Sequence, residues 1–221
     1  MAKNNPPDNQ RVADPSVRAA FLVLTLALAV ACSSGPGPVD DASYEQGIMA
    51  SRAQKDTYLR TDKDSPIPES ARATFPGLTY YPIDSSYHVP AYLSEDRTGP
   101  PVIIELQMSQ NDRQKMRRVG TLSFTLGEAA YKLTVFTEIN DTSIAHLFLP
   151  FADLTSGGET YKGGRFLNLT RTRTGLYDLD FNQAYHPYCV YNSSWDCPVP
   201  PRENHLPVAI RAGERLAAPH S

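Results

Sequence analysis

VGTLSFTLGEAAYKLTVF, residues 119–136, carries the clearest hairpin pattern of the sequence. In its first half Leu122, Phe124 and Leu126 alternate with three hydroxyl residues, so a strand here would have one apolar face and one polar face. The triplet 127–129, Gly-Glu-Ala, supplies a turn, and a second β-compatible run follows it. The stretch therefore predicts a half-buried antiparallel hairpin.

Short runs rich in Val, Ile, Tyr, Phe and Thr surround this hairpin from Leu78 onward. They predict further strands at residues 78–82, 86–93, 101–108, 145–150, 165–169, 176–181 and 206–211. Because most connections are short, we expect a mainly β fold, either an antiparallel barrel or a two-layer sandwich, with a short N-terminal helix. A solvated hairpin loop is expected to hold the basic cluster Arg113, Lys115, Arg117 and Arg118.

A helix-compatible segment precedes the β-rich part. Residues 44–59 carry apolar or aromatic side chains on one helical face and predict a short amphipathic helix. Prolines at positions 66 and 68 forbid its continuation, and a single further turn is compatible with residues 68–73. The chain thus divides into a helix and proline-rich connector at 44–74, a β-rich domain at 75–215 and a tail at 216–221.

An apolar run at residues 19–31 stands directly before Cys32. A helix of thirteen residues covers about 20 Å, less than the ~30 Å core of a bilayer, so residues 1–31 are predicted to be a signal peptide. The sequence LAVAC at 28–32 resembles the bacterial lipobox, which implies that Cys32 is lipidated and that 32–43 form a flexible tether. An ordinary cleaved secretory signal and an uncleaved anchor are the alternatives.

The resemblance to the lipobox implies a localisation. We expect a lipid-anchored protein of the cell envelope, on the periplasmic or cell-surface side, and in the outer membrane if the bacterium is Gram-negative. Without the leader, 18 basic residues stand against 22 acidic ones, a net charge of −4. Nucleic-acid binding draws on a clustered basic face. The expected partners are therefore the membrane, through the lipid anchor, and an unknown small ligand or envelope protein, with no nucleic acid.

Cys189 and Cys197 are the two remaining cysteines. Export would place them in an oxidising compartment, so a disulfide between them is expected. The alternative is a metal site completed by His186 or His205, but the spacings C-x-x-C and H-x-H are absent. The sequence thus predicts no metal and no cofactor.

The segment 153–214 carries a family resemblance. Its motifs include Thr155-Ser156-Gly157, Glu159-Thr160-Tyr161, Gly164-Arg165, Asp180-Phe181-Asn182, Ala184-Tyr185, Cys197-Pro198, Leu206-Pro207 and Gly213-Glu214. These motifs resemble the signature of the bacterial and archaeal family called domain of unknown function 1684, and the resemblance extends over about residues 44–215. It implies no particular reaction, ligand or partner.

Polar residues are dense in the same segment and admit two interpretations. In the first, Glu159 and Asp180 are paired carboxylates of a hydrolase, and Arg165 or Arg211 holds an anionic ligand. In the second, buried Arg, Asp and Asn side chains satisfy one another in a structural network. The candidate binding residues are Tyr161, Arg165, Asn182, Tyr185, Asn204 and Arg211.

The function expected from these observations is that of a lipid-anchored envelope protein whose β-domain binds a ligand or partner. The hydrolase is one alternative. A purely structural envelope lipoprotein is another, for which an exposed apolar patch without a pocket would be typical. Tyr185, Tyr188, Tyr191 and Trp195 crowd around the cysteine loop, where aromatic rings either pack the loop or stack on a sugar or peptide.

Overall fold

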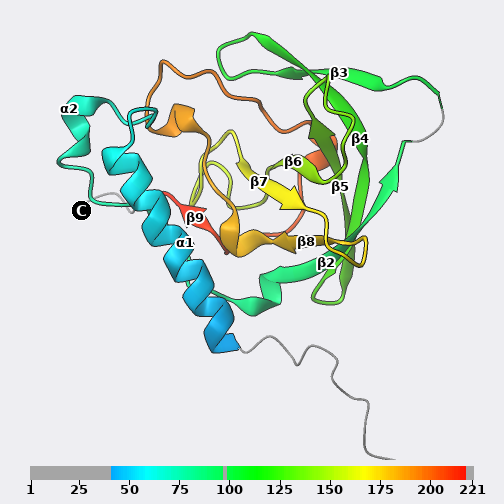
Figure 1. Ribbon diagram of the computed structural model, residues 1–221, viewed down its shortest axis with the longest axis horizontal. Coiled ribbons are helices and arrows are strands. Elements are labelled where there is room, and N and C mark those ends of the chain that lie inside the picture. The colour runs from blue at the N-terminus through cyan, green and yellow to red at the C-terminus, as the bar shows by residue number, and fades with distance from the viewer. Residues whose placement is uncertain (1–40, 97–98, 218–221) are drawn as a thin grey trace, which may run out of the picture. The chain divides into compact units, whose positions relative to one another are not determined.

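A nearly closed antiparallel barrel forms the centre of the computed structural model (Figure 1), which describes residues 41–96 and 99–217. The helices are α1 (Asp41–Thr61) and α2 (Glu69–Arg72), and short 3₁₀ turns lie at η2 (Ser85–Tyr87), η3 (Phe181–Gln183), η4 (Tyr188–Val190) and η5 (Arg202–Asn204). The strands are β1 (Thr79–Tyr80), β2 (His88–Glu95), β3 (Val102–Gln107), β4 (Arg113–Leu126), β5 (Ala129–Thr137), β6 (His146–Phe151), β7 (Arg165–Thr170), β8 (Tyr177–Asp180) and β9 (Glu214–Arg215).

The main sheet has the strand order β7-β6-β5-β4-β2-β8, and β3 also pairs with β4. Neighbouring strands are antiparallel throughout, and β7 contacts β8, which brings the two ends of the sheet together. A separate two-stranded ladder joins β1 to β9. The fold is therefore mainly β with a barrel, as the sequence predicts, and the helix α1 precedes it.

The hairpin of residues 119–136 is confirmed as the long pair β4 and β5, in which Leu122 faces Leu133. Its turn has two central residues, and Gly127 adopts the left-handed φ of 60° that a II′ turn needs at its first position. A bulge lies at Arg118/Gly120, where β4 exchanges β3 for β2 as its partner. A side chain at Gly120 would overlap the backbone of Ser94, so only glycine fits this crossing.

Two local predictions about β structure are wrong. The basic cluster of residues 113–118 lies in β4, paired with β3, rather than in a hairpin loop. The reason is Met116, which is buried against Leu106 and Phe136 and pulls its neighbours into the sheet. Residues 206–211 form no strand, and the carbonyl of Ile210 in this segment accepts a hydrogen bond from a buried arginine side chain instead of from a strand.

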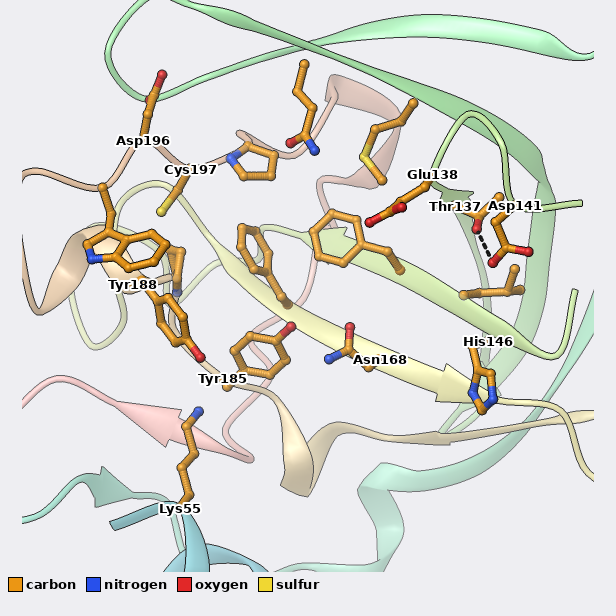
Figure 2. Close-up of a pocket in the computed structure, with 18 of the residues that line it drawn as sticks. Lys55, Thr137, Glu138, Asp141, His146, Asn168, Tyr185, Tyr188, Asp196 and Cys197 are labelled. Atoms are coloured by element: carbon orange, nitrogen blue, oxygen red, sulfur yellow. Dashed lines mark hydrogen bonds between the residues drawn. The ribbon is translucent and has the colours of Figure 1, made fainter. Parts of the chain in front are cut away.

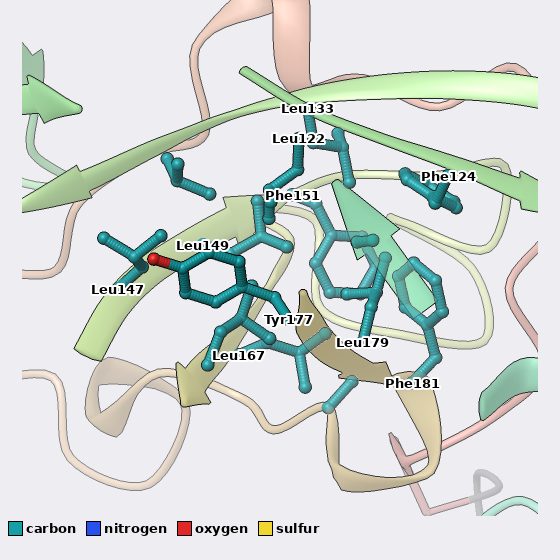
Figure 3. Close-up of a cluster of buried hydrophobic side chains, with 14 of the residues drawn as sticks. Leu122, Phe124, Leu133, Leu147, Leu149, Phe151, Leu167, Tyr177, Leu179 and Phe181 are labelled. Carbon is teal, nitrogen blue, oxygen red and sulfur yellow. The ribbon is translucent and has the colours of Figure 1, made fainter. Parts of the chain in front are cut away.

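The core fills the barrel with leucine and aromatic side chains from β4, β5, β6, β7 and β8 (Figure 3), and β2 adds Ala91. Leu149, Phe151, Tyr177 and Phe181 have no exposed surface. Phe181 packs edge-on against Phe151 with ring centroids 5.3 Å apart. Burying each such side chain contributes roughly 1.5–3 kcal/mol, so this interior is the main source of stability.

The leader, residues 1–31, and residues 32–40 of the predicted tether lie outside the described residues, and so does lipidation at Cys32. The tether predicted at 32–43 is wrong for its last three residues, because 41–43 form the first turn of α1. In the described part of the chain, neither helix combines the length and the apolar character needed to cross a membrane. The predicted helix at 44–59 is present and longer, as α1, and the predicted turn at 68–73 is present as α2.

Candidate functional site

Arg165 is the centre of a buried polar network and has no exposed surface. One terminal nitrogen donates to Asp153 Oδ2 at 2.8 Å and to the carbonyl of Ile210 at 2.7 Å. The other donates to the carbonyls of Ala212 at 2.5 Å and Glu214 at 3.1 Å. Only Nε has no partner among the described residues. Arg165 therefore holds the segment 210–214 against β7 and has no terminal N–H group left for an anionic ligand.

The carboxylate of Glu214 extends this network toward α1, with its side chain 1% exposed. Oε1 accepts from Lys55 Nζ at 2.5 Å, while Oε2 accepts from the hydroxyl of Tyr191 and from the backbone N–H of His186, each at 2.8 Å. Burial is the largest cause of the raised pKa of Tyr191 and the nearby Glu214 charge adds to it, so the phenol stays protonated as a donor. Glu214 thus ties α1 to the barrel.

His186 is enclosed in the same network. Its Nε2 accepts from the backbone N–H of Tyr161 at 3.3 Å, and its Nδ1 lies 3.6 Å from Glu214 Oε2. Burial, followed by the positive charges of Arg165 and Lys55, lowers the pKa of His186 to about 3. The imidazole is therefore neutral at physiological pH and acts as a structural acceptor.

The two carboxylates predicted as a catalytic pair occupy different surroundings. Asp180 is 3% exposed and accepts from Tyr44, from Gln183 and from the backbone and side chain of Asn182, so it caps η3. Glu159 has a 44% exposed side chain and pairs with Arg211 at 2.8 Å, an interaction that lowers the pKa of Glu159. The two carboxylates share no hydrogen-bond partner.

The remaining predicted site residues are mostly structural. Asn204 is fully buried, where its Oδ1 accepts from the N–H of Thr134 and its Nδ2 donates to the carbonyls of Thr134 and Pro150. The amide thus bridges β5 and β6 as a short strand would. Asn182 is buried and its Nδ2 donates to the hydroxyl of Tyr44 at 2.9 Å.

The predicted disulfide is absent, because Cys189 and Cys197 are both free thiols. The backbone N–H of Cys189 donates to Cys197 Sγ at 3.2 Å, whereas the thiol of Cys189 is directed at the hydroxyl of Tyr161, 3.9 Å away. Burial raises the pKa of Cys197 to about 12, so this thiol remains protonated. In the described part of the chain, no group of three or more His, Cys, Asp or Glu side chains could hold a metal ion.

An open cavity of about 1250 Å³ lies against the outer face of β6 and β7 (Figure 2). Side chains alternate along these strands: Leu147 and Leu149 enter the core, whereas Phe148 and Asn168 face outward into the cavity. The segment 185–198, one face of α1, part of β4 and residues 137–141 complete the walls.

Main-chain hydrogen bonds hold the segment 185–198 over the sheet at both ends. Tyr185 exchanges two backbone bonds with Phe166, at 2.8 and 3.0 Å. Beyond the other end, the N–H of Val199 donates to the carbonyl of Gln107 at 2.7 Å. Because both ends are fixed, the wall formed by this segment is held to the barrel by backbone hydrogen bonds.

Aromatic rings make up much of the wall. Phe166 packs edge-on against Phe148 and Tyr185, with centroids 4.9 and 5.9 Å apart. At the other side Tyr188 and Trp195 form a second edge-on pair at 5.2 Å, and Trp195 is 42% exposed. All five of these rings line the cavity.

A smaller cavity of about 210 Å³ adjoins the first and shares Ser51, Lys55, Asn168 and Tyr185 with it. The hydroxyl of Tyr80, which also borders it, is buried without a partner among the described residues. Such a space is large enough for water molecules, which would satisfy this hydroxyl.

Comparison with known proteins places the chain in a family. The model of the family described as "protein of unknown function (DUF1684)" matches residues 73–215. The chain belongs to this family. The match to the family model begins after α1. Within the described structure, the DUF1684 domain therefore supplies the barrel and the segment 185–198, and α1 adds a further wall of the cavity.

Among solved structures, the solution NMR structure of an uncharacterised protein from Haloarcula marismortui is similar to this DUF1684 protein. The two are 36% identical, the match covers 82% of this chain and 98% of the other, and the TM-score is 0.63. A search of the curated proteins found no match.

Sequence reasoning identified few of the residues that border the cavities. Of the predicted binding residues only Tyr185 lines the large cavity, and Tyr185 and Asn182 line the small one. It missed Phe148, Phe166 and Asn168. A signal was present: the run HLFLPF at 146–151 lacks the alternation of a half-buried strand, which indicates a strand with a second apolar face.

Proposed function

We propose that this DUF1684 protein is an exported, lipid-anchored envelope protein whose β-domain binds a ligand in the large cavity on the outer face of β6 and β7. The observation that carries the proposal is this cavity, an open concavity with aromatic walls and a few polar groups. Ligand sites in proteins typically have this composition.

The polar network beside the cavity supports this assignment by elimination. Its terminal guanidinium, carboxylate and amide groups already have partners inside the chain, as the contacts of Arg165, Glu214 and Asn204 show. Such groups fix the backbone and offer little to a ligand. The network positions one wall of the cavity instead, since Glu214 is paired with Lys55 of α1, which lines the site.

The anchor is the part of the proposal that rests on sequence alone. The apolar run 19–31, the lipobox-like LAVAC ending at Cys32 and the Gly/Pro/Ser-rich residues that follow all support export followed by acylation. Metabolic labelling with a fatty-acid probe tests it: the wild type is expected to carry the label and Cys32→Ser to lose it. Equal labelling of both, or of neither, would refute the anchor.

A ligand screen by thermal shift tests the cavity. Compounds that raise the Tm of the purified wild type are expected to leave that of Tyr188→Ala unchanged, because Tyr188 borders the cavity. Tyr92→Ala is the matched control, since Tyr92 is 64% exposed and lies outside both cavities. A shift that Tyr188→Ala retains in full would locate the ligand elsewhere and contradict the assignment.

A further inference from the structure

We propose that the large cavity binds a neutral oligosaccharide, with sugar rings resting on the aromatic walls and their hydroxyl groups hydrogen-bonded to side-chain amides and carboxylates along the border. This inference rests on the proposed function, because it names the class of ligand for the same site.

The charge of the lining argues against an anionic ligand. Lys55 supplies the only ammonium group among the described lining residues, and it is already paired with Glu214 at 2.5 Å. Three carboxylates, Glu138, Asp141 and Asp196, border the same space. Recognition of phosphate or carboxylate needs arginine or lysine groups that are free to pair. A ligand without charge avoids the repulsion that these carboxylates would impose on an anion.

The aromatic rings fit the apolar faces of sugars. The face of a π-system carries partial negative charge, and the axial C–H bonds on the face of a pyranose are weakly positive. Trp195, whose partner Tyr188 packs edge-on against it, is 42% exposed at the border of the cavity. A sugar face packed on the exposed part of this ring would remove it from water.

Unpaired polar side chains provide hydrogen bonds of the kind that sugar hydroxyls need. Gln54 of α1, Gln114 of β4 and Glu138 after β5 all line the cavity and are exposed. Their side-chain amide and carboxylate groups have no hydrogen-bond partner among the described residues. Amides donate and accept, and carboxylates accept from hydroxyls, so together they match groups that do both.

The extent of the cavity points to several sugar units. Its volume of about 1250 Å³ exceeds the range of about 300–1,000 Å³ usual for a single drug-sized ligand. Figure 2 shows Tyr188 and Asp196 at one end of the lining and Asp141 and His146 at the other, with Asn168 between them. Such an extended, open site suits a chain better than one compact molecule.

Intrinsic fluorescence tests the inference directly, because Trp195 is the one tryptophan of the whole sequence. Titrating the purified protein with chitotetraose, cellotetraose and maltotetraose, all neutral, is expected to give a saturable change in emission with at least one of them. Tyr188→Ala keeps the fluorophore and is expected to weaken the affinity about tenfold. Tyr92→Ala, the matched control, should bind as the wild type does.

Calorimetry with Trp195→Ala, which needs no fluorophore, is expected to show the same tenfold weakening or a complete loss. Absence of a saturable change with all three oligosaccharides up to about 10 mM would overturn the inference, as would an affinity that Tyr188→Ala leaves unchanged. The ligand-binding function would still stand if a charged compound or a peptide raised the Tm in the screen and lost this effect in Tyr188→Ala. If no ligand class did so, both proposals would fail.

Discussion

The buried network around Arg165 and the cavity on the outer face of β6 and β7 lie next to each other and differ in where their polar groups find partners. In the network, Asp153 and Glu214 accept hydrogen bonds from groups of the same chain. At the cavity, the side chains of Gln54 and Gln114 have no such partners among the described residues. A high density of charged residues in a sequence thus marks a scaffold here, whereas the candidate site is made of aromatic rings and unpaired amides.

Replacing Arg165 with methionine should destabilise the protein more than any other change proposed below. The substitution removes the guanidinium that donates to Asp153 Oδ2 and to three backbone carbonyls, and breaking a buried pair in this way costs about 3–5 kcal/mol. Urea unfolding should show the loss as a lower midpoint. The exposed Arg211→Met serves as the control and should keep the wild-type midpoint. Equal midpoints for the two variants would show that the network is not the scaffold.

Acidification tests the buried network through one titratable group, His186. Because the pKa of His186 falls to about 3 in the fold from an ordinary value of about 6.5, the unfolded chain takes up a proton that the folded chain refuses. Stability is therefore fully present above pH 6.5 and falls as the pH drops from there toward 3. Lowering the pH from about 7.5 to about 5.5 should therefore reduce the free energy of unfolding by about 1.4 kcal/mol through His186 alone.

Urea midpoints measured at both pH values check this expectation. His186→Gln keeps an amide that can accept from Tyr161, but it does not titrate, so its loss between the two pH values should be smaller than that of the wild type. The groups that face the imidazole, Glu214, Lys55 and Arg165, are the same in both proteins. An identical loss in the two would show that His186 is not the group responsible.

Glu159→Gln is expected to have the smallest effect. Glu159 pairs with Arg211 at the surface, where water screens both charges, so the urea midpoint should not change measurably. Ligand affinity should be unchanged as well, because Glu159 lines neither cavity. A loss of binding without a loss of stability would instead return this carboxylate to the candidate site.

The sequence predicted the fold well where periodicity is local. The alternation of Leu122, Phe124 and Leu126 specified the hairpin, and the prolines at 66 and 68 correctly placed the end of the helix before them, at Thr61. It failed at residues 206–211, whose apolar side chains suit a strand. The carbonyl of Ile210 binds the guanidinium of Arg165 instead, a contact between residues 45 positions apart that no local pattern contains.

The candidate site was harder to predict for a related reason. The cavity combines α1, the outer faces of β6 and β7 and the segment 185–198, so its residues come together only through the topology of the barrel. The predicted site residues were mostly polar, but the type of a residue alone does not show whether its hydrogen bonds are satisfied within the chain. Tyr185 was predicted because it stood in the family motif, whereas Phe148 lay in the strand predicted at 145–150 and had no polar group to mark it.

The way in which α1 is attached has a consequence for how a ligand enters. The helix buries only Ile48 and Leu59, and polar contacts such as Tyr44 to Asp180 and Lys55 to Glu214 provide much of its remaining hold on the barrel. Segments with few buried apolar contacts open locally at a lower free energy than the core does. The cavity therefore has one side formed by the well-packed strands of the barrel and one side, α1, whose local opening is expected to cost less free energy than opening the barrel.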